Sequence, residues 1–295
     1  MPGSLLHGIF APITTPFDEK GWIDYDHLTE NVKKYARTKL QGFLVLGSNG
    51  ENKSLSTQEK ERVVKTVISH KAANQIAMVA SIFESTFETT EFALWAEEAG
   101  ADYITLLPPS YFKSAMKDNV LIRYFTDVAS VMKIPCLLYK AAQFSGGVDL
   151  SLTVIKECAK HPNIHGIKDS SSGGMEKILY GAPKDFAVMS GSATTFFAGM
   201  LGGAVGGVLS MANYLPDKTV ELYQYIKEGK LQEAVALNQK IVNCNIEVSG
   251  SYGVAGVKCA MDQTGYNGDF PRLPLPPISP EGAASIKEAL KELLF

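Results

Sequence analysis

The stretch PCLLYKAAQFSGGVDLSLTVIKECAKHPNIHGIKDSS, residues 135–171, contains the pattern that decides the fold. It begins with a short apolar run, Pro135–Tyr139, continues through an amphipathic segment, Leu152–Lys160, and ends in a second apolar run, Ile164–Lys168. Short runs rich in β-branched and aromatic residues, separated by a helix-length segment, are typical of buried strands and a helix between them. The stretch therefore predicts two parallel strands joined by a crossover helix.

The same strand–helix unit recurs along the chain. Further strands are expected at Gly8–Ile13, Gly42–Leu46, Ile76–Ala80, Tyr103–Leu107, Phe186–Ser190 and Gly206–Leu209. Helices are expected between them, the first capped by Asp24 and the second opened by Thr57, with later ones at Thr86–Ala99, Lys117–Val131, Met175–Tyr180, Thr194–Met200 and Asp217–Glu228. Eight units predict a closed (β/α)8 TIM barrel. An open doubly wound sheet is the alternative, but the strand-end glycines do not form its GxGxxG pattern.

The end of the chain predicts a helical extension. Helical stretches near Leu231–Val248, Val254–Gln263 and Pro280–Leu294 follow the eighth unit. The stretch RLPLPPISP, residues 272–280, is a proline-punctuated connection, not a long domain linker. We expect a barrel over residues 1–225 and a C-terminal helical extension packed on it over residues 226–295.

Composition excludes several classes of protein. The hydrophobic fraction of 45%, the charged fraction of 20% and the net charge of -3 are ordinary for a globular chain of 295 residues and give no broad basic field, so nucleic acid is not expected as a partner. The longest small-apolar stretch, Phe196–Leu209, is glycine-rich and shorter than a membrane span. The opening MPGSLLHGIF lacks the basic and long apolar regions of a signal peptide. Because the four cysteines, Cys136, Cys158, Cys244 and Cys259, form no CxxC pair, we expect reduced thiols in a cytoplasmic protein.

Two residues at strand ends could carry chemistry, since active sites of TIM barrels lie at the carboxyl ends of the strands. Lys168 ends the sixth apolar run, where partial desolvation would lower its pKa and leave a nucleophilic amine. The alternative is a lysine that lies in water or pairs with Asp169. Tyr139 ends the neighbouring fifth run, where its phenol could move protons, and the alternative is an ordinary core tyrosine.

Other candidate sites are weaker. In GSNGE, residues 47–51, the Ser48 hydroxyl and the amides near Ser48 and Asn49 could hold a carboxylate, although a tight turn also explains the glycines. The segment GGAVGGVLS, residues 202–210, fits close backbone packing better than a phosphate cradle, because no basic residue accompanies it. His161 and His165 have a metal-pair spacing, but Pro162 and the following strand prevent a shared helix face. We expect no metal and no cofactor.

The motifs GIFAPITTPF, GSNGE, PPSYF, LLYK and GIKDSS occur in order over nearly the whole chain. Together they resemble the family of dihydrodipicolinate synthase and N-acetylneuraminate lyase. The resemblance implies a (β/α)8 barrel with a C-terminal helical extension, and a Schiff base between Lys168 and pyruvate or a related 2-oxo acid. It also implies that Tyr139 shuttles protons, that Ser48 joins the proton relay, and that Ser48 and Asn49 lie in a carboxylate-binding loop.

The resemblance further implies that Tyr111, in PPSYF, reaches into the site of a neighbouring subunit, and hence a homotetramer built from tight dimers. Two departures stand out. Asn49 replaces a hydroxyl residue of the family loop, although its amide can still donate to a carboxylate. Lys140 follows Tyr139 where the family has asparagine, and it either meets an acidic group or points to solvent.

A third departure concerns the substrate. Phe144 stands where the family's synthases place an arginine that binds the carboxylate of the aldehyde substrate, which argues against synthase activity. Residues expected to shape the pocket are Gly191, Ser192, Val208 and Ser210, and hydroxyls in SGSATT, residues 190–195, could bind a polyol. That segment lacks the acidic cluster of neuraminate lyases, so neuraminate is not favoured.

These observations predict a metal-free class I aldolase that joins pyruvate to an aldehyde or releases it from a 2-keto-3-deoxy (sugar) acid. The alternatives are dihydrodipicolinate synthase, which condenses pyruvate with aspartate semialdehyde, a dehydratase of 2-keto-3-deoxy acids, and a non-catalytic member that binds a 2-oxo acid.

Overall fold

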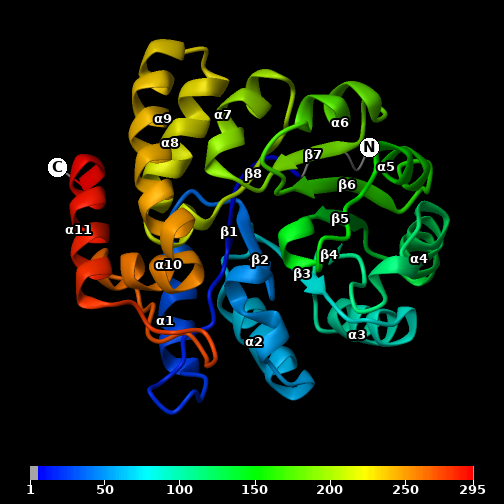
Figure 1. Ribbon diagram of the computed structural model, residues 1–295, viewed down its shortest axis with the longest axis horizontal. Coiled ribbons are helices and arrows are strands. Elements are labelled where there is room, and N and C mark those ends of the chain that lie inside the picture. The colour runs from blue at the N-terminus through cyan, green and yellow to red at the C-terminus, as the bar shows by residue number, and fades with distance from the viewer. Residues whose placement is uncertain (1–5, 295) are drawn as a thin grey trace. The chain divides into compact units, whose positions relative to one another are not determined.

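The computed structural model describes residues 6–294. Residues 1–5, where the segment considered for a signal peptide begins, and residue 295 lie outside the described residues. The strands join in chain order into a closed barrel (Figure 1), and their bounds are β1 Gly8–Pro12, β2 Gly42–Val45, β3 Ile76–Ser81, β4 Tyr103–Leu106, β5 Cys136–Lys140, β6 Ile164–Asp169, β7 Ala187–Ser190 and β8 Gly206–Val208. The predicted TIM barrel is confirmed, and each strand lies where the apolar runs placed it.

Burial explains why short apolar runs form these strands. Every residue of β1 to β4, β7 and β8 is buried, as expected for parallel strands that are covered on both faces. In β5 and β6 the half-buried exceptions are Lys140 and His165. The run of apolar residues therefore reports a strand with two covered faces rather than an alternating surface strand.

The described residues group into two compact units, unit 1 with residues 6–7 and 76–208 and unit 2 with residues 8–75 and 209–294. In unit 1, parallel pairs run from β3 to β8 in chain order. The helices of this unit are α3 Thr86–Glu98, α4 Asp118–Val131, α5 Leu152–Cys158, α6 Met175–Gly181 and α7 Ala193–Leu201. At the starts of α3, α5 and α7, the side chains of Ser85, Ser151 and Ser192 accept hydrogen bonds from backbone N–H groups of the first turn.

Unit 2 contains the parallel pair β1–β2 and the helices α1 Tyr25–Tyr35, α2 Thr57–His70, α8 Pro216–Lys227, α9 Leu231–Asn245, α10 Ser251–Gln263 and α11 Pro280–Leu294. Asp24 caps α1 as predicted, and Ser56 forms a capping box with Glu59 at the start of α2. The helices α9, α10 and α11 pack on one another and confirm the C-terminal helical extension (Figure 1). The boundaries at residues 225 and 226 remain a prediction.

The extension is interrupted where the sequence predicted it, between Val248 and Val254. After α9 the chain forms a π-helical turn, Ile246–Gly250, and it kinks three residues later. Gly253, with φ 57° and ψ -139°, is the residue that departs from helical geometry there. Within residues 6–294, no helix has the length and apolar character needed to cross a bilayer.

Candidate active site

Lys168 and Tyr139 lie side by side in unit 1. They are register partners at the carboxyl ends of β6 and β5, and the Nζ atom of Lys168 lies 4.0 Å from the centroid of the Tyr139 ring. The exposed fractions are 5% for Lys168 and 1% for Tyr139. Parallel pairing puts both side chains on one face of the sheet, because partners in register share their orientation. The structure thus brings the two predicted catalytic residues together.

Lys168 does not adopt the arrangement of an ordinary surface lysine. Its burial excludes a side chain lying in water. The side chain of Asp169, the next residue of the strand, points to the opposite face of the sheet. Its Oδ1 atom accepts hydrogen bonds from the Ser171 amide at 3.0 Å and from the Ser171 hydroxyl at 2.6 Å. Among the described residues Lys168 has no carboxylate partner. The alternative of an ion pair with Asp169 is therefore wrong.

Gly191 lies against the Lys168 side chain. Its amide donates to the Asp169 carbonyl at 2.6 Å, which fixes the turn after β7 beside the end of β6. A Cβ atom at this position would lie 3.0 Å from Cε of Lys168 and would overlap the Ser170 hydroxyl. Only glycine fits without a shift of one of these side chains. Of the predicted pocket residues, Gly191 is thus placed beside Lys168.

The loop after β5 is fixed by its own contacts. Nζ of Lys140 lies 2.7 Å from Oδ1 of Asp149, so Lys140 meets an acidic group, which was one of its two expected outcomes. The Ser145 hydroxyl is buried and bonds to the carbonyls of Ala141 and Val148 at 3.1 and 2.7 Å. Phe144, in the middle of the loop, is 51% exposed. Its ring offers a ligand neither a hydrogen-bond donor nor a charge.

The hydroxyls after β7 bond chiefly to their own segment. Ser192 caps α7, because its side chain accepts a hydrogen bond from the backbone amide of Thr194. The hydroxyl oxygens of Ser192 and Thr194 lie 2.8 Å apart. Ser190 bonds to the Ser192 carbonyl and lies 3.0 Å from the Thr195 hydroxyl. These pairs preorganise a row of hydroxyls, and a polyol contact from Ser192 stays a prediction.

The glycine-rich segment, residues 202–210, is buried where it forms β8, whereas Gly203 is exposed and has nothing within 4 Å of a Cβ atom. Gly206, Gly207 and Val208 form β8 and all are buried. The role of Val208 in shaping the pocket stays a prediction.

In unit 2, the predicted carboxylate-binding loop is a single 3-10 turn, Ser48–Gly50. Its flanks are two non-glycine residues with left-handed backbone, Leu46 with φ 61° and Glu51 with φ 55°. Nδ2 of Asn49 donates to Oγ of Ser210 at 2.9 Å, so two of the predicted residues meet. The turn has a defined conformation, which a ligand-binding loop requires.

Tyr111 is held by its backbone and exposed at its ring. The Glu84 carboxylate accepts hydrogen bonds from the backbone amides of Ser110 and Tyr111 at 2.7 and 2.8 Å. The Tyr111 ring is 80% exposed and meets Phe112 edge to face, with centroids 5.0 Å apart. An anchored, exposed aromatic side chain suits a contact with another subunit.

Sequence reasoning missed two ion pairs of unit 2. Nζ of Lys258 lies 2.7 Å from Oε1 of Glu51, and both side chains are fully buried. Arg272 pairs with Glu59 at 2.6 Å, and the hydrogen bond from Arg272 lowers the pKa of Glu59 to about 2. A single lysine inside the apolar stretch GVKCAM, residues 256–261, was the available signal for the first pair.

His161 and His165, which were not expected to bind a metal together, have different partners. His161 contacts the Ser130 hydroxyl and His165 contacts the Pro162 carbonyl, so they do not form a common ligand set. Asp24, His27 and Asp269 come together within ligand distance. Nδ1 of His27 already bonds Asp269 at 2.7 Å, a contact that raises the pKa of His27, and Asp24 caps α1.

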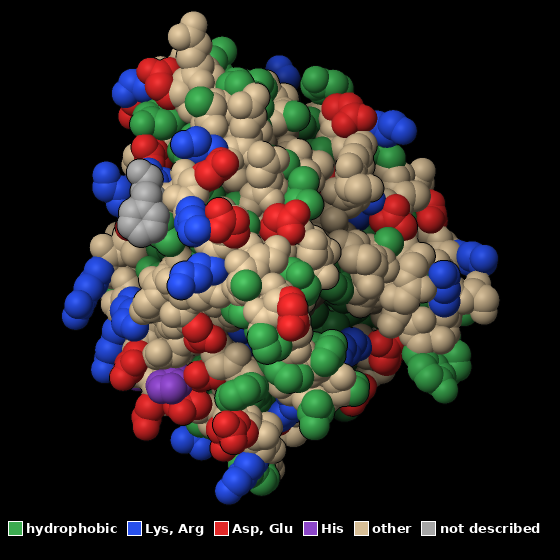
Figure 2. Space-filling view, turned by 60° about the vertical axis from the view of Figure 1, so that its left-hand side comes forward, with side chains coloured by type: hydrophobic (Ala, Val, Ile, Leu, Met, Phe, Trp, Pro, Cys, Tyr) green, Lys and Arg blue, Asp and Glu red, His purple; other side chains and the backbone are tan. Residues whose placement is uncertain are grey.

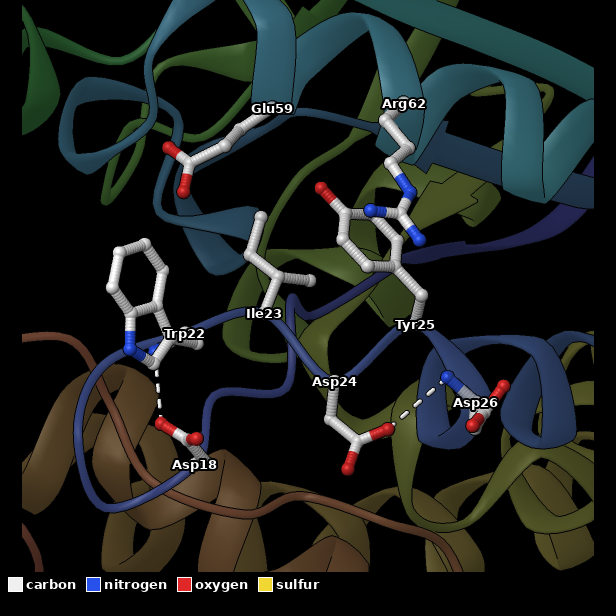
Figure 3. A pocket seen from close by; sticks show the side chains of 8 residues that line it. All are labelled: Asp18, Trp22, Ile23, Asp24, Tyr25, Asp26, Glu59 and Arg62. Carbon is white, nitrogen blue, oxygen red and sulfur yellow. Dashed lines mark hydrogen bonds between the residues drawn. The ribbon is translucent and has the colours of Figure 1, made fainter.

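One surface pocket of unit 2 contains none of the predicted site residues. Its volume is about 520 Å³, and its lining is drawn in Figure 3: Asp18, Trp22, Ile23, Asp24, Tyr25, Asp26, Glu59 and Arg62. Arg62 stacks on Tyr25, with its guanidinium carbon 3.7 Å from the ring centroid. On the face shown in Figure 2, basic and acidic side chains are interspersed and form no broad basic patch.

Comparisons with known proteins show which family the chain is similar to. A sequence model of the Dihydrodipicolinate synthetase family matches residues 5–293. A probable mitochondrial 4-hydroxy-2-oxoglutarate aldolase of Emericella nidulans is 30% identical over 295 residues, which is 98% of this chain and 95% of that protein. A 4-hydroxy-tetrahydrodipicolinate synthase of Methanococcoides burtonii is 32% identical, with 98% and 99% covered. The crystal structure of a dihydrodipicolinate synthase from Acinetobacter baumannii, complexed with pyruvate, superposes with a TM-score of 0.91 at 28% identity and covers 98% of this chain and 99% of that one.

Proposed function

Because the chain belongs to the dihydrodipicolinate synthetase family and is a pyruvate-dependent lyase of class I, we propose that it is an aldolase of 2-keto-3-deoxy acids. Pyruvate is the donor and an aldehyde is the acceptor. The observation that carries the proposal is the buried Lys168 amine, 4.0 Å from the Tyr139 ring, combined with Phe144 in place of a carboxylate-binding arginine.

The chemistry follows from these two side chains. The Lys168 amine attacks the C2 ketone of the substrate, and loss of water from the carbinolamine gives an iminium ion. The electrons of the C3–C4 bond then move into the iminium as that bond breaks, while the C4 hydroxyl loses its proton and becomes an aldehyde. The remaining enamine takes up a proton at C3, and water releases pyruvate and the free amine. Tyr139 is the group that moves these protons.

Three further residues keep the roles that the family resemblance implies. Ser48 joins the proton relay, and its loop with Asn49 binds the carboxylate next to the ketone. Tyr111 completes the relay in the site of a neighbouring subunit. These assignments make the protein a homotetramer of two tight dimers, which light scattering of the purified protein tests directly. A cytoplasmic location also belongs to this proposal, whereas the name of the Emericella nidulans relative places that protein in mitochondria.

The acceptor is inferred from the residues that the family resemblance assigns to the C4 end of the substrate. Phe144 has no donor for a second carboxylate, and Ser192 and Thr194 present a row of hydroxyls. An uncharged, hydroxylated acceptor matches this lining, as in a 2-keto-3-deoxy sugar acid. The substrate named for the Emericella nidulans relative, 4-hydroxy-2-oxoglutarate, has the same 4-hydroxy-2-oxo core with a second carboxylate.

A second candidate is the synthase reaction, because the Methanococcoides burtonii relative carries that name. Phe144 opposes it, since an aldehyde carboxylate would lose its charge-assisted bonds at this position. A dehydratase and a non-catalytic binder of 2-oxo acids share the first step and are separated by product.

The deciding experiment incubates the purified protein with a panel of substrates and measures pyruvate with lactate dehydrogenase. The panel contains 2-keto-3-deoxy sugar acids and 4-hydroxy-2-oxoglutarate, and a parallel assay supplies pyruvate and aspartate semialdehyde. Pyruvate release from sugar acids, faster than from 4-hydroxy-2-oxoglutarate, supports the proposal. Turnover only with aspartate semialdehyde, loss of water without carbon–carbon cleavage, or no turnover of any substrate overturns it in favour of the synthase, the dehydratase or the binder respectively.

A further inference from the structure

Lys258 is a fully buried cation in the C-terminal helical extension. Its side chain has 0% exposure, and it interrupts an otherwise apolar segment of α10. Burial lowers the pKa of Lys258, and the carboxylate of Glu51 opposes that effect. A buried ammonium is costly unless its donors are all satisfied, so its partners show what it holds in place.

The ammonium group contacts three separate segments of unit 2. It donates hydrogen bonds to the carbonyls of Thr15 at 2.7 Å and Phe270 at 2.6 Å, and it forms an ion pair with Oε1 of Glu51 at 2.7 Å. The ring of Phe17 closes the remaining side, with its centroid 4.5 Å from Nζ. Lys258 therefore joins the segment after β1, the segment after β2 and the connection that precedes α11.

Glu51 directly follows the turn Ser48–Gly50. It has a left-handed backbone, which is unfavourable for a residue with a side chain. Leu46, just before the turn, has the same unfavourable geometry. Backbone strain of this kind persists only where surrounding contacts enforce it, and it gathers at ligand-binding segments. Glu51 is enforced from both carboxylate oxygens, by Lys258 and by the Arg272 amide at 2.9 Å from Oε2.

A second connection runs from Lys258 to the same turn. The carbonyl of Thr15 accepts from Lys258, and the hydroxyl of Thr15 donates to the carbonyl of Gly50 at 2.8 Å. Gly50 also lies close to β1, because a Cβ atom there would be 3.1 Å from the carbonyl of Ile13. Contacts thus hold Gly50, the last residue of the turn, and Glu51, the residue that follows it. Both sets of contacts include the ammonium group of Lys258, through Thr15 in the first case and directly in the second.

We propose that Lys258 and Glu51 are positioning residues that hold the turn Ser48–Gly50 in its carboxylate-binding conformation. The inference rests on the proposed function, in which this turn binds the carboxylate of the 2-oxo acid. Neither residue touches the substrate. Their loss lowers the affinity for pyruvate and leaves the amine of Lys168 able to form its adduct at saturating pyruvate.

If the ion pair served stability alone, its removal would leave the affinity for pyruvate unchanged. Buried ion pairs contribute little net stability compared with uncharged replacements of similar size, whereas removal of one partner leaves an unpaired buried charge. The informative variant is therefore the double substitution Glu51→Gln with Lys258→Met, which removes both charges together. The matched control is Glu59→Gln, which breaks the neighbouring ion pair with Arg272 in the same unit and leaves Glu51 in place.

The experiment titrates pyruvate in the presence of borohydride and follows the covalent adduct by intact-protein mass spectrometry. In the double variant we expect the half-saturating pyruvate concentration to rise about tenfold, as for loss of a charge-assisted bond, with the same final adduct yield. The Glu59→Gln protein is expected to match the unsubstituted protein. Equal half-saturation in the double variant overturns the inference.

Folding of each protein is checked by circular dichroism and thermal unfolding. If the double variant does not fold, Glu51→Asp takes its place, since it keeps the charge but shortens the reach to Lys258. A raised half-saturating concentration supports the inference and an unchanged one overturns it. Failure of the unsubstituted protein to form any adduct instead contradicts the proposed function, so the two ideas fail by different observations.

Discussion

The Lys168 amine faces the ring of Tyr139 across two paired strands, with 4.0 Å between Nζ and the ring centroid. The pair is buried, and its members lie 29 positions apart in the sequence on the consecutive strands β5 and β6. Register alone sets them opposite each other. The amine is the nucleophile that Schiff-base chemistry requires, and a phenol on the same face of the sheet is one of the groups that can move its protons.

Tyr139→Phe tests the proton transfer. The substitution keeps the buried ring against Lys168 and removes only the hydroxyl, so we expect the fold to survive and the turnover number to fall about 100-fold or more. Steady-state pyruvate release measures the turnover, and trapping at saturating pyruvate checks that Lys168 still forms an adduct. Full turnover in the phenylalanine variant would exclude Tyr139 as the proton shuttle.

Phe144→Arg tests the acceptor specificity. The new guanidinium supplies a donor for a second carboxylate, so we expect kcat/KM for aspartate semialdehyde or 4-hydroxy-2-oxoglutarate to rise about tenfold relative to an uncharged sugar acid. Phe144→Met is the matched control, because it fills the same exposed position without a charge. If both variants shift the ratio equally, charge at this position does not choose the acceptor.

Gly191→Ala tests the close packing beside Lys168. The added methyl group would lie 3.0 Å from Cε of Lys168 and overlap the Ser170 hydroxyl, so we expect kcat to fall about tenfold or more as the amine is displaced. Gly173→Ala is the control, since nothing lies within 4 Å of a Cβ atom there.

A double variant separates the two contacts of that methyl group. Adding Ser170→Gly to Gly191→Ala removes the overlap with the hydroxyl and leaves the contact with Lys168. We expect thermal stability to recover while kcat remains low. Recovery of both quantities would assign the whole effect to Ser170.

Glu59 predicts a dependence of stability on pH. Arg272 lowers the pKa of Glu59 from 4.5 to about 2, so the folded state favours the ionised form and this contribution is complete above pH 4.5. It declines as the pH falls below 4.5 and is lost near pH 2. Allowing for screening by solvent, the contribution is on the order of 1 kcal/mol. Urea unfolding should show the Glu59→Gln protein less stable at pH 7, with the difference shrinking toward pH 2. A difference that stays constant with pH would rule out this ion pair as its source.

The strands and most helix ends were predictable because their determinants are local. Ile164–Lys168 is an apolar run whose composition specifies a strand with both faces covered, and β6 follows it within one residue. Asp24 is a helix cap that the next residues reveal, and its side chain accepts the amides of Asp26 and His27. The resemblance then named Lys168 and Tyr139, and the register of two strands explains why they meet.

The remaining features depend on contacts between distant residues. Glu51 and Lys258 lie 207 positions apart, and nothing near either one specifies the other. The turn of Asn49 toward Ser210 likewise depends on where two segments meet in space. The sequence predicted a break before Val254, and Gly253 provides it, but the π-helical turn Ile246–Gly250 was not predicted, because local helix propensity does not report how a helix accommodates one extra residue.

The central claim is that Lys168 forms the Schiff base, and borohydride trapping with pyruvate tests it most directly. The purified protein is treated with pyruvate and borohydride, digested, and analysed by peptide mass spectrometry, with Lys168→Arg as the control. We expect one reduced pyruvate adduct, on the peptide that contains Lys168, and none in the arginine variant. An unmodified Lys168, or an adduct on another lysine such as Lys140, would contradict the account.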